Sequence, residues 1–536
     1  MEPCGQMIVF LFSFYLCQYT ESATFLGIVF PVKGQLIELQ TLILGLVDRG
    51  HQGYLAVGEH ALPYLPTTLT NNEHVPLLTF KTRSADFMLF EDKEEQRNGL
   101  LAFFDDPYER IFPFKAIAFR NKVKKLMTTE YTEDMLKDDI FNNRIKELGI
   151  DMAVLHNAFG FFPTSYLLPY KHSIPYITSS FIPHPLSGIS LLPSFIPHPF
   201  NTGAYTDKMT FSQRMGNFLM YKLFAVLLKP GEYPENLFID YLPGLPKKTF
   251  PELISASELF IVTGKHPAID YPQPTMPNTI FAGGMNTQPG KPLSPELQKF
   301  MDAHKNGVIV VSFGSWTNYF PEHITTKFLA AFEQLDYGVI WRFTGPKPSG
   351  IPEPIKLSLW LPQNDLLAHP NTKLFISHCG NGGTFEALYH GIPVLGFPLF
   401  ADQVYNSNKF QHRGLSLTMD ITEFSTEALV DNINKMIHNS SFYDTAKKLS
   451  VIYHDQQWTA QQQAAHWIEH VLKHGGSYLR SPSAAMPWYQ YYLVDVILFL
   501  LTVIVCTVLL CIVCCKCICR NCCESKAIAP SERKVK

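Results

Sequence analysis

Residues 360–403, WLPQNDLLAHPNTKLFISHCGNGGTFEALYHGIPVLGFPLFADQ, decide the fold of this 536-residue chain. Their middle predicts a strand over 374–377, a glycine-rich loop over 378–383 and a helix over 384–390 that Gly391 ends. A glycine loop that leads into a helix presents free backbone N–H groups and the positive end of the helix dipole, which favour a phosphate or diphosphate. Many α/β proteins have such a turn without a ligand, so the loop alone leaves both interpretations open.

The polar side chains around this loop are of the types that suit a nucleotide sugar. Trp360 precedes the loop and is placed to stack on a planar base, and His378 begins the loop, where an imidazole reaches phosphates. Glu386, early in the helix, is placed to accept hydrogen bonds from ribose hydroxyls. Asp402 and Gln403 follow the next strand as a carboxylate-amide pair suited to sugar hydroxyls. This order predicts a nucleotide-sugar site at the carboxyl ends of parallel strands.

The whole stretch 360–403 resembles the signature of the UDP-glycosyltransferase family, which includes the UDP-glucuronosyltransferases. The resemblance implies an α/β fold of the GT-B type, with two Rossmann-like domains and a cleft between them. The donor-site residues that it implies are Trp360 and Gln363 at uracil, Glu386 at ribose, His378 with Gly380, Asn381 and Gly382 at the diphosphate, and Asp402 and Gln403 at the transferred sugar. In relatives a second small-residue loop, here Ser312, Gly314 and Ser315, faces the diphosphate and the sugar from across the cleft.

Both positions of the catalytic pair that the resemblance implies carry other residues here. In the family a catalytic His stands 16 residues before the His of an Arg-Gly-His turn, which is His51 in this chain, so the position holds Gln35. Glutamine has no useful basicity near neutral pH. The partner Asp falls at His156 by spacing, or at Asn157 if one residue is inserted, and neither is acidic. His156 is left open as an unusual base or as a structural residue at a strand end.

Two functions follow from this combination. The first is an enzyme that moves a hexose, glucuronic acid or glucose, from a UDP-sugar co-substrate to a small lipophilic acceptor with inversion, with no further cofactor and no metal. The second is a non-catalytic binder of UDP-sugars or lipophiles, and either protein could form homo-oligomers or hetero-oligomers with relatives. The complete donor half favours the enzyme, because UDP is a good leaving group once a helix terminus holds its diphosphate. Loss of a general base slows a reaction by about a hundred- to ten-thousand-fold without abolishing it.

The composition of the chain limits the kinds of cross-link and partner that it can have. Of 11 cysteines, Cys379 alone lies in the bulk of the chain, which excludes a disulfide framework there. A net charge of −3 with 17% charged residues indicates no basic surface for nucleic acid.

The pentad Phe-Ile-Pro-His-Pro occurs at 181–185 and at 195–199, and its two histidines could suggest a metal. The flanking prolines supply no other ligand, which favours a proline-rich loop over the acceptor cleft.

Two segments direct the chain to a membrane. Residues 7–19 form the apolar core of a signal peptide with a cut after Ala23, although no Lys or Arg precedes it. Residues 496–515 carry no charge over 20 positions and are long enough to span a bilayer. Aromatic residues lie on the N-terminal side of this span and basic residues follow it, which predicts a type I topology with a lumenal body. The last residues, 533–536, resemble a retention signal of the endoplasmic reticulum.

The alternation of strand and helix patterns predicts two parallel sheets, joined by a Pro/Gly-rich linker over 287–293. A long helical stretch over 208–228 resembles the helices that cover the acceptor site in animal relatives, and we expect its apolar side to face the membrane. The expected divisions are a signal peptide (1–23), an acceptor-binding domain (24–286), a UDP-sugar-binding domain (287–480), a membrane-proximal segment (481–495), a transmembrane helix (496–515) and a cytosolic tail (516–536).

Overall fold

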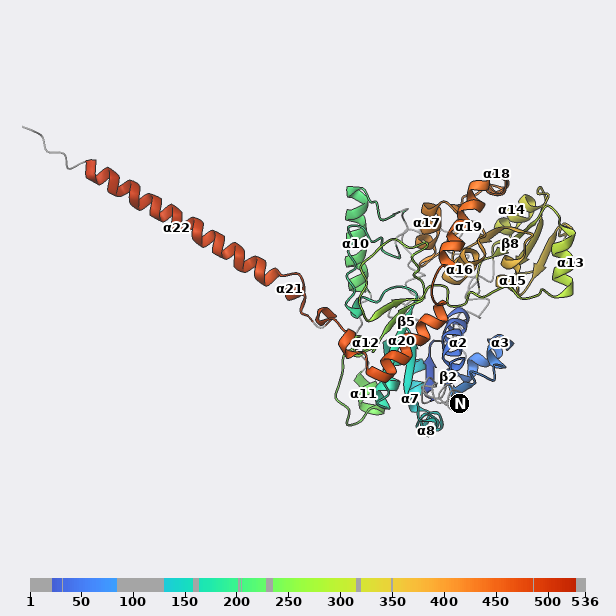
Figure 1. The fold of residues 1–536 in the computed structure, drawn as a ribbon, viewed down its shortest axis with the longest axis horizontal. Coiled ribbons are helices and arrows are strands. Elements are labelled where there is room, and N and C mark those ends of the chain that lie inside the picture. Colours follow the sequence, from blue (N-terminus) through green and yellow to red (C-terminus); the bar gives the residue numbers. More distant parts are fainter. Residues whose placement is uncertain are drawn as a thin grey trace, which may run out of the picture. The chain divides into compact units, whose positions relative to one another are not determined.

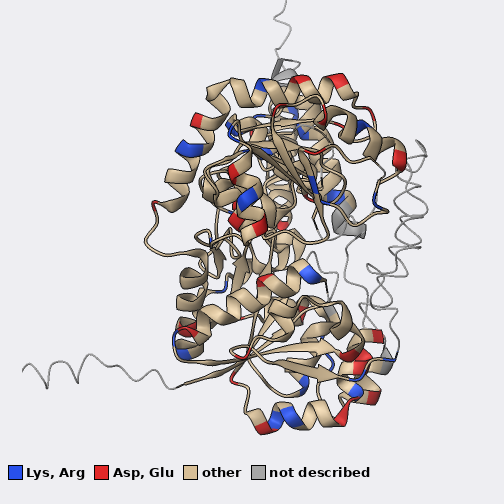
Figure 2. Cartoon of the chain, turned by 90° about the vertical axis from the view of Figure 1, so that its right-hand side faces the viewer, with Lys and Arg blue, Asp and Glu red and all other residues tan. Residues whose placement is uncertain are grey.

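The computed structural model describes residues 22–30, 32–83, 130–157, 163–200, 203, 205–227, 235–314, 320–348, 350–484 and 486–526. The chain divides into two units, Met1–Arg480 and Ser481–Lys536. In the described part of the first unit, two parallel sheets are each covered by helices (Figure 1). Charged residues lie mainly on the outer helices, and the strands between them carry few (Figure 2).

The first sheet, as far as the chain is described, has seven strands in the order β3-β2-β1-β4-β5-β6-β7. Its strands are β1 (Thr24–Ile28), β2 (Gln52–Gly58), β3 (Leu77–Phe80), β4 (Met152–His156), β5 (Tyr176–Ser180), β6 (Phe260–Val262) and β7 (Thr279–Phe281). Its helices are α2 (Lys33–Val47), α3 (Thr67–Thr70), α7 (Tyr131–Lys137), α8 (Asp139–Leu148), α9 (Leu167–Lys171), α10 (Phe211–Leu227), α11 (Glu235–Tyr241) and α12 (Phe250–Ser255).

The second sheet has six described strands in the order β10-β9-β8-β11-β12-β13. Its strands are β8 (Val308–Ser312), β9 (Gly338–Arg342), β10 (Ile355–Ser358), β11 (Thr372–Ser377), β12 (Val394–Gly396) and β13 (Ser416–Thr418). The helices of this half are α13 (Pro295–Ala303), α14 (Glu322–Phe332), α15 (Gln363–Ala368), α16 (Asn381–His390), α17 (Gln403–Arg413), α18 (Thr426–His438), α19 (Ser440–His454) and α20 (Ala460–His474). The predicted parallel sheets in two α/β halves are confirmed, and β10 is a strand that the sequence pattern did not predict.

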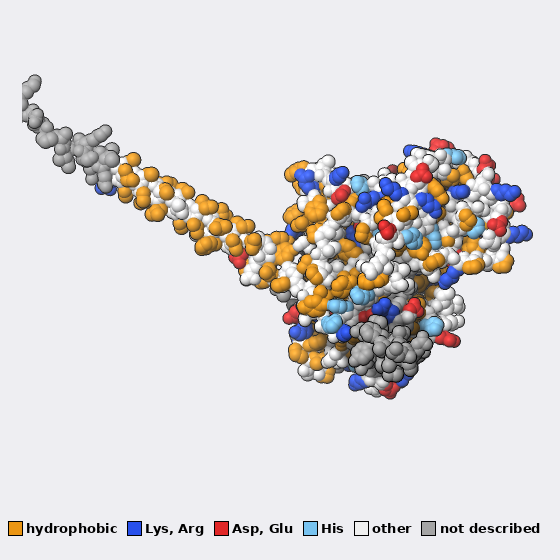
Figure 3. Space-filling model, in the orientation of Figure 1, with side chains coloured by type: hydrophobic (Ala, Val, Ile, Leu, Met, Phe, Trp, Pro, Cys, Tyr) orange, Lys and Arg blue, Asp and Glu red, His pale blue; other side chains and the backbone are white. Residues whose placement is uncertain are grey.

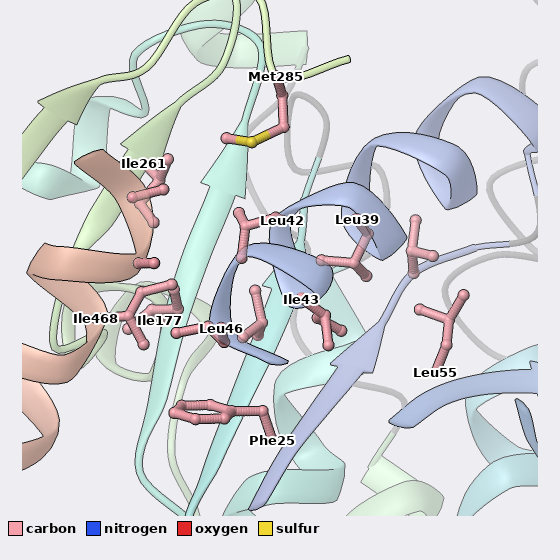
Figure 4. Packing of buried hydrophobic residues seen from close by; sticks show 14 of the residues in the cluster. Phe25, Leu39, Leu42, Ile43, Leu46, Leu55, Ile177, Ile261, Met285 and Ile468 are labelled. Atoms are coloured by element: carbon pink, nitrogen blue, oxygen red, sulfur yellow. The ribbon is translucent and has the colours of Figure 1, made fainter. Parts of the chain in front are cut away.

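The last helix of this unit packs on the first sheet. Leu39, Leu42, Ile43 and Leu46 of α2 point toward the strands, and Ile468 of α20 reaches the same buried cluster (Figure 4). The helices α2 and α20 also lie side by side in Figure 1. The range 287–480 therefore contains one helix, α20, whose apolar face belongs to the core of the other half. This packing connects the two halves in addition to the linker between them.

Both sheets have the same kind of switch point, where the strand order reverses. In the first sheet this point lies between β1 and β4, and in the second between β8 and β11. Loops that follow the two central strands of a doubly wound sheet separate there and leave a crevice at the carboxyl ends. Gln35, Asn157, Gly314 and His378 follow these four strands, whereas Trp360 and Asp402 follow β10 and β12.

The second unit contains α21 (Trp488–Tyr491) and α22 (Val494–Lys526). Within the described residues, one helical segment, Val494–Arg520, is long and apolar enough to cross a membrane, with a mean hydropathy of 3.3. Hydrophobic side chains cover this helix along its length (Figure 3). The signal-peptide prediction falls mostly outside the described residues, as does the retention signal over 533–536.

Candidate active site

The imidazole of His378 lies at the switch point of the second sheet, directly after β11. Gly314, two residues after β8, and Gly380 lie on the ring, and a Cβ at either position would collide with Nε2 of His378. Gly314 also has a φ of +75°, a conformation that other residues adopt at a cost. The structure therefore requires glycine at both positions to seat this ring. The expected neighbour Ser315 lies outside the described residues.

The electrostatics of His378 favour a neutral ring. Burial lowers the pKa of His378 to about 4, a hydrogen bond to the backbone carbonyl of Ser312 acts in the opposite direction, and Arg342 lowers it further. In the described structure Nδ1 of His378 is buried and has no hydrogen-bond partner. Unpaired buried polar atoms are uncommon in folded proteins and call for an explanation. A ligand that pairs with this nitrogen supplies one.

The helix α16 begins three residues earlier than its sequence pattern predicts. Asn381 is its first residue, so Gly382 and Gly383 belong to its first turn rather than to the loop. The N-cap residue is Gly380, which offers no capping side chain. The N–H groups of the first turn have no intrahelical acceptor. The prediction of a longer loop was wrong because glycine is a poor helix former but is tolerated in a first turn.

A second group of side chains lies beside this helix terminus. Nε2 of Gln363 donates to Oε2 of Glu386 at 2.5 Å, which links the first residue of α15 to the second turn of α16. Burial raises the pKa of Glu386 to about 7, although the Gln363 bond opposes this. Trp360 is 54% exposed, and the guanidinium of Arg342 lies 5.7 Å from its ring centroid. Arg342 also donates to the carbonyl of Gly314. It therefore links the loop after β8 to the loop that carries Trp360, a role that the sequence did not suggest.

Asp402 is the N-cap residue of α17 and Gln403 is its first residue, and their side chains make different hydrogen bonds. Oε1 of Gln403 accepts from the backbone N–H groups of Leu399 and Phe400 at 2.8 and 3.1 Å, so this oxygen holds its own loop. The amide nitrogen of Gln403 is then the part left to meet a ligand. Oδ2 of Asp402 accepts from Nδ2 of Asn406 at 2.7 Å, and burial raises the pKa of Asp402.

In the first sheet, Gln35 comes after β1, His156 is the last residue of β4 and Asn157 follows it. Gln35 lies in the first turn of α2 and is half-buried. His156, 2% exposed, has no hydrogen-bond partner on either ring nitrogen within the described chain, and burial lowers its pKa to about 4. Asn157 is fully buried, and its Nδ2 donates to the hydroxyl of Tyr166 at 3.3 Å. Burial and the lowered pKa fit the structural interpretation of His156 better than a role as a base, and the hydrogen bond to Tyr166 gives Asn157 a role in the core.

A buried ion cluster joins the two halves near this site. Nζ of Lys265 and Nζ of Lys409 lie 3.1 and 2.9 Å from Oδ1 of Asp270. Lys265 also donates to the hydroxyl of Tyr405 at 2.5 Å. Burial acts to raise the pKa of Asp270, but the two ammonium groups outweigh it and the pKa is lowered overall. Sequence reasoning missed this cluster, because Lys409 is 139 residues from Asp270 and each member resembles an ordinary surface residue.

The two proline-flanked histidines stabilise their own turns. Nδ1 of His184 accepts from the backbone N–H of Leu186 at 3.1 Å, and Nδ1 of His198 accepts from that of Phe200 at 3.2 Å. Both rings are buried. The repeated pentad is therefore a repeated turn, as the loop interpretation predicts.

Several known proteins resemble this chain. Rat UDP-glucuronosyltransferase 2B1 (Rattus norvegicus) is 30% identical over 533 residues, which cover 93% of this chain and 94% of that protein. Rat 2-hydroxyacylsphingosine 1-beta-galactosyltransferase is 36% identical over 301 residues, 55% of this chain and 55% of that protein. The solved structure of the spinosyn forosaminyltransferase SpnP covers 85% of this chain and all of its own, with a TM-score of 0.54 at 12% identity.

The structural likeness, at that identity, bears on the fold alone, and it confirms the predicted GT-B arrangement. A family model described as UDP-glucoronosyl and UDP-glucosyl transferase matches residues 64–528. The match covers most of both sheet-containing halves and extends into the apolar helix. The chain belongs to the UDP-glucoronosyl and UDP-glucosyl transferase family.

Proposed function

We propose that this protein transfers a hexose from a UDP-sugar to a small lipophilic acceptor, with inversion at the sugar carbon. Residues 24–286 bind the acceptor and residues 287–480 bind the donor. Glucuronic acid or glucose is the hexose, in keeping with the family description and with the rat glucuronosyltransferase. The rat galactosyltransferase, named for a sphingosine derivative, supports a lipid-like acceptor.

The proposal rests on the unpaired polar groups at the N-terminus of α16. Unpaired N–H groups of a first turn, the positive end of the helix dipole and the unpaired Nδ1 of His378 lie together. Gly382 adds open space there, because a Cβ built on it meets nothing within 4 Å. This combination is suited to the diphosphate of a UDP-sugar and has no evident purpose in the fold itself.

The remaining donor contacts follow from the positions around this terminus. The exposed ring of Trp360 stacks on uracil with Gln363 beside it, and Glu386 accepts from the ribose hydroxyls. Asp402 and Gln403 meet the transferred sugar. Ser312 and Gly314 line the opposite side of the diphosphate. The leaving UDP is stabilised by groups that are already in place, which is how preorganised electrostatics lower a barrier.

The acceptor and the membrane are linked in this proposal. Five apolar side chains of α10 are about half exposed or more: Phe211, Met215, Phe218, Leu219 and Leu223. Together with Val494–Arg520 as an anchor, they let lipid-soluble acceptors arrive from the bilayer of the endoplasmic reticulum, with the body in the lumen. Phe218→Glu in an anchor-free chain should release the protein from vesicles, and unchanged binding would contradict this part.

Donor turnover by microsomes that contain the protein tests the central proposal. UDP release is followed with UDP-glucuronate, UDP-glucose, UDP-N-acetylglucosamine and UDP-galactose against a panel of lipophilic phenols and amines. We expect release that needs an acceptor with one donor preferred, and we expect Asp402→Ala to abolish it. Tight UDP-sugar binding without release for any acceptor would instead identify a non-catalytic binder.

A further inference from the structure

The helix α2 carries a carboxylate one turn after the position where the family has its catalytic His. Glu38 and Gln35 are three residues apart, and such residues project from the same side of a helix. The buried residues of α2 include Leu36 and Leu39 but neither Gln35 nor Glu38. Both side chains therefore leave the face that packs on the sheet, and position 38 can serve the same crevice as position 35.

The surroundings of Glu38 connect it to the donor half. Its carboxylate is hydrogen-bonded by the side chain of Thr263, and the charge of Asp402 acts on it. Thr263 directly follows β6, and its backbone carbonyl accepts from Nδ2 of Asn381 at 3.4 Å. Glu38 thus lies where α2, the end of β6, the first residue of α16 and the start of α17 converge. This is also where the proposed function places the diphosphate and the sugar.

One oxygen of this carboxylate has nothing to bind in the described structure. Oε1 of Glu38 is buried and has no hydrogen-bond partner among the described residues. A buried carboxylate oxygen without a donor is costly in a folded chain, and nothing in the packing of α2 requires an acid at this position. An acceptor hydroxyl that enters the crevice would supply the missing donor.

We propose that Glu38 is the general base of this transferase and takes the proton of the acceptor hydroxyl. The inference rests on the proposed function and names the residue that performs its proton transfer. As the hydroxyl oxygen forms its bond to the anomeric carbon of the sugar, the bond from that carbon to the UDP oxygen breaks and its electron pair leaves with UDP. The hydroxyl proton moves to Oε1 of Glu38, which returns it to solvent after the products leave.

The acidity of Glu38 suits this work better than that of the alternatives. Burial raises the pKa of Glu38 to about 7, the hydrogen bond with Thr263 opposes the rise, and Asp402 adds to it. A general base is most effective when its pKa lies near the working pH. His156, with its pKa lowered to about 4 and its ring buried, is a much weaker base, and Gln35 is none.

The test compares 1-naphthol with 1-naphthylamine, acceptors of the same shape, in the full-length protein with the donor that the wild type uses. In Glu38→Gln we expect kcat/KM for 1-naphthol to fall by about a hundred- to ten-thousand-fold. Transfer to the amine, which attacks through a neutral lone pair, should fall far less, and the Kd for the UDP-sugar should stay within twofold. Glu59→Gln, at an exposed carboxylate of the same half, is the matched control and should change nothing.

The pH profile and a rescue variant separate a base from a structural residue. Wild-type kcat/KM for 1-naphthol should rise with pH through about 7 as Glu38 ionises, and this limb should be absent in Glu38→Gln. Gln35→His combined with Glu38→Gln restores a base on the same side of α2, and we expect at least a tenfold gain over Glu38→Gln alone.

Three other outcomes would overturn either the assignment of Glu38 as the base or the proposed function itself. Transfer to 1-naphthol within threefold of wild type in Glu38→Gln would remove Glu38 as the base and leave the proposed function intact. Loss of naphthol transfer, amine transfer and donor binding together would also overturn the assignment, because it would indicate a structural role. A wild-type protein without acceptor-dependent UDP release would overturn the proposed function, and the assignment of Glu38 with it.

Discussion

Replacing Gly382 by alanine should stabilise the protein and weaken its donor binding at the same time. Gly382 is the second residue of α16, and a Cβ added there meets nothing within 4 Å. Alanine is favoured over glycine in a helix by roughly 0.5–1 kcal/mol, because glycine loses more conformational freedom on folding. Intramolecular packing therefore does not explain this glycine, whereas close approach of a diphosphate to the first-turn N–H groups does.

The expected magnitudes have opposite signs. We expect Gly382→Ala to raise the free energy of unfolding by roughly 0.5–1 kcal/mol, which corresponds to about 1–4 °C in Tm for a domain of this size. The added methyl group occupies space that the proposed function gives to the diphosphate. The affinity for UDP should consequently fall by at least about tenfold, or roughly 1.4 kcal/mol.

A matched control lies in the first half of the chain. Gly34 is the second residue of α2, and a Cβ built on it also meets nothing within 4 Å. Gly34→Ala should therefore raise Tm by a similar amount and leave the Kd for UDP unchanged. Differential scanning fluorimetry and isothermal titration calorimetry on the two variants measure both quantities.

Two results would refute the reasoning. An unchanged UDP affinity in Gly382→Ala would show that the diphosphate does not lie against the first turn of α16. A lower Tm in the same variant would show that the position is constrained by the fold, so that its glycine needs no ligand to explain it.

Three further predictions concern buried groups around the site. Asp270→Asn removes the counter-charge of two buried lysines and should cost about 3–5 kcal/mol in urea unfolding, whereas Glu296→Gln, in an exposed pair, should leave the unfolding midpoint unchanged. Because binding of an anion favours imidazolium, UDP-sugar affinity should rise as pH falls toward about 4 in wild type and in His390→Gln, and lose this dependence in His378→Phe. Burial raises the pKa of Cys379 to about 12, so iodoacetamide at neutral pH should modify this thiol only after unfolding, as peptide mass spectrometry would record.

The sequence predicted the second sheet and its loops well for a physical reason. Short apolar runs alternate with helical patterns there, and glycine marks the places where the chain turns closely around a side chain. The start of α16 was misplaced by three residues, because the low helix propensity of Gly382 and Gly383 conceals a first turn that tertiary structure imposes. Local patterns carry no record of such long-range constraints.

The parts that the sequence did not reveal are those made by contacts between distant segments. Packing of α20 on α2 depends on an apolar face that would suit either sheet, so its pattern could not name its neighbour. Lys409 joins Lys265 and Asp270 in an ion cluster only after the two halves meet. The burial of His156 is likewise a property of the assembled sheet, and the lowered pKa that this burial causes argues against the histidine as a base.

The donor side of the site and the position of the general base tolerate substitution to different degrees. His378 is seated by Gly314 and Gly380, where any side chain would collide with its ring, so backbone sterics restrict the donor side. A general base is subject to no such restriction, since it needs only a titrating oxygen or nitrogen within reach of the acceptor. On α2, residues 35 and 38 offer two such places on one side of the helix. A base can therefore move by one helical turn while the donor site stays as it is. Such a move would leave Gln35 at the old position and, one turn later, a Glu38 whose Oε1 has no partner among the described residues.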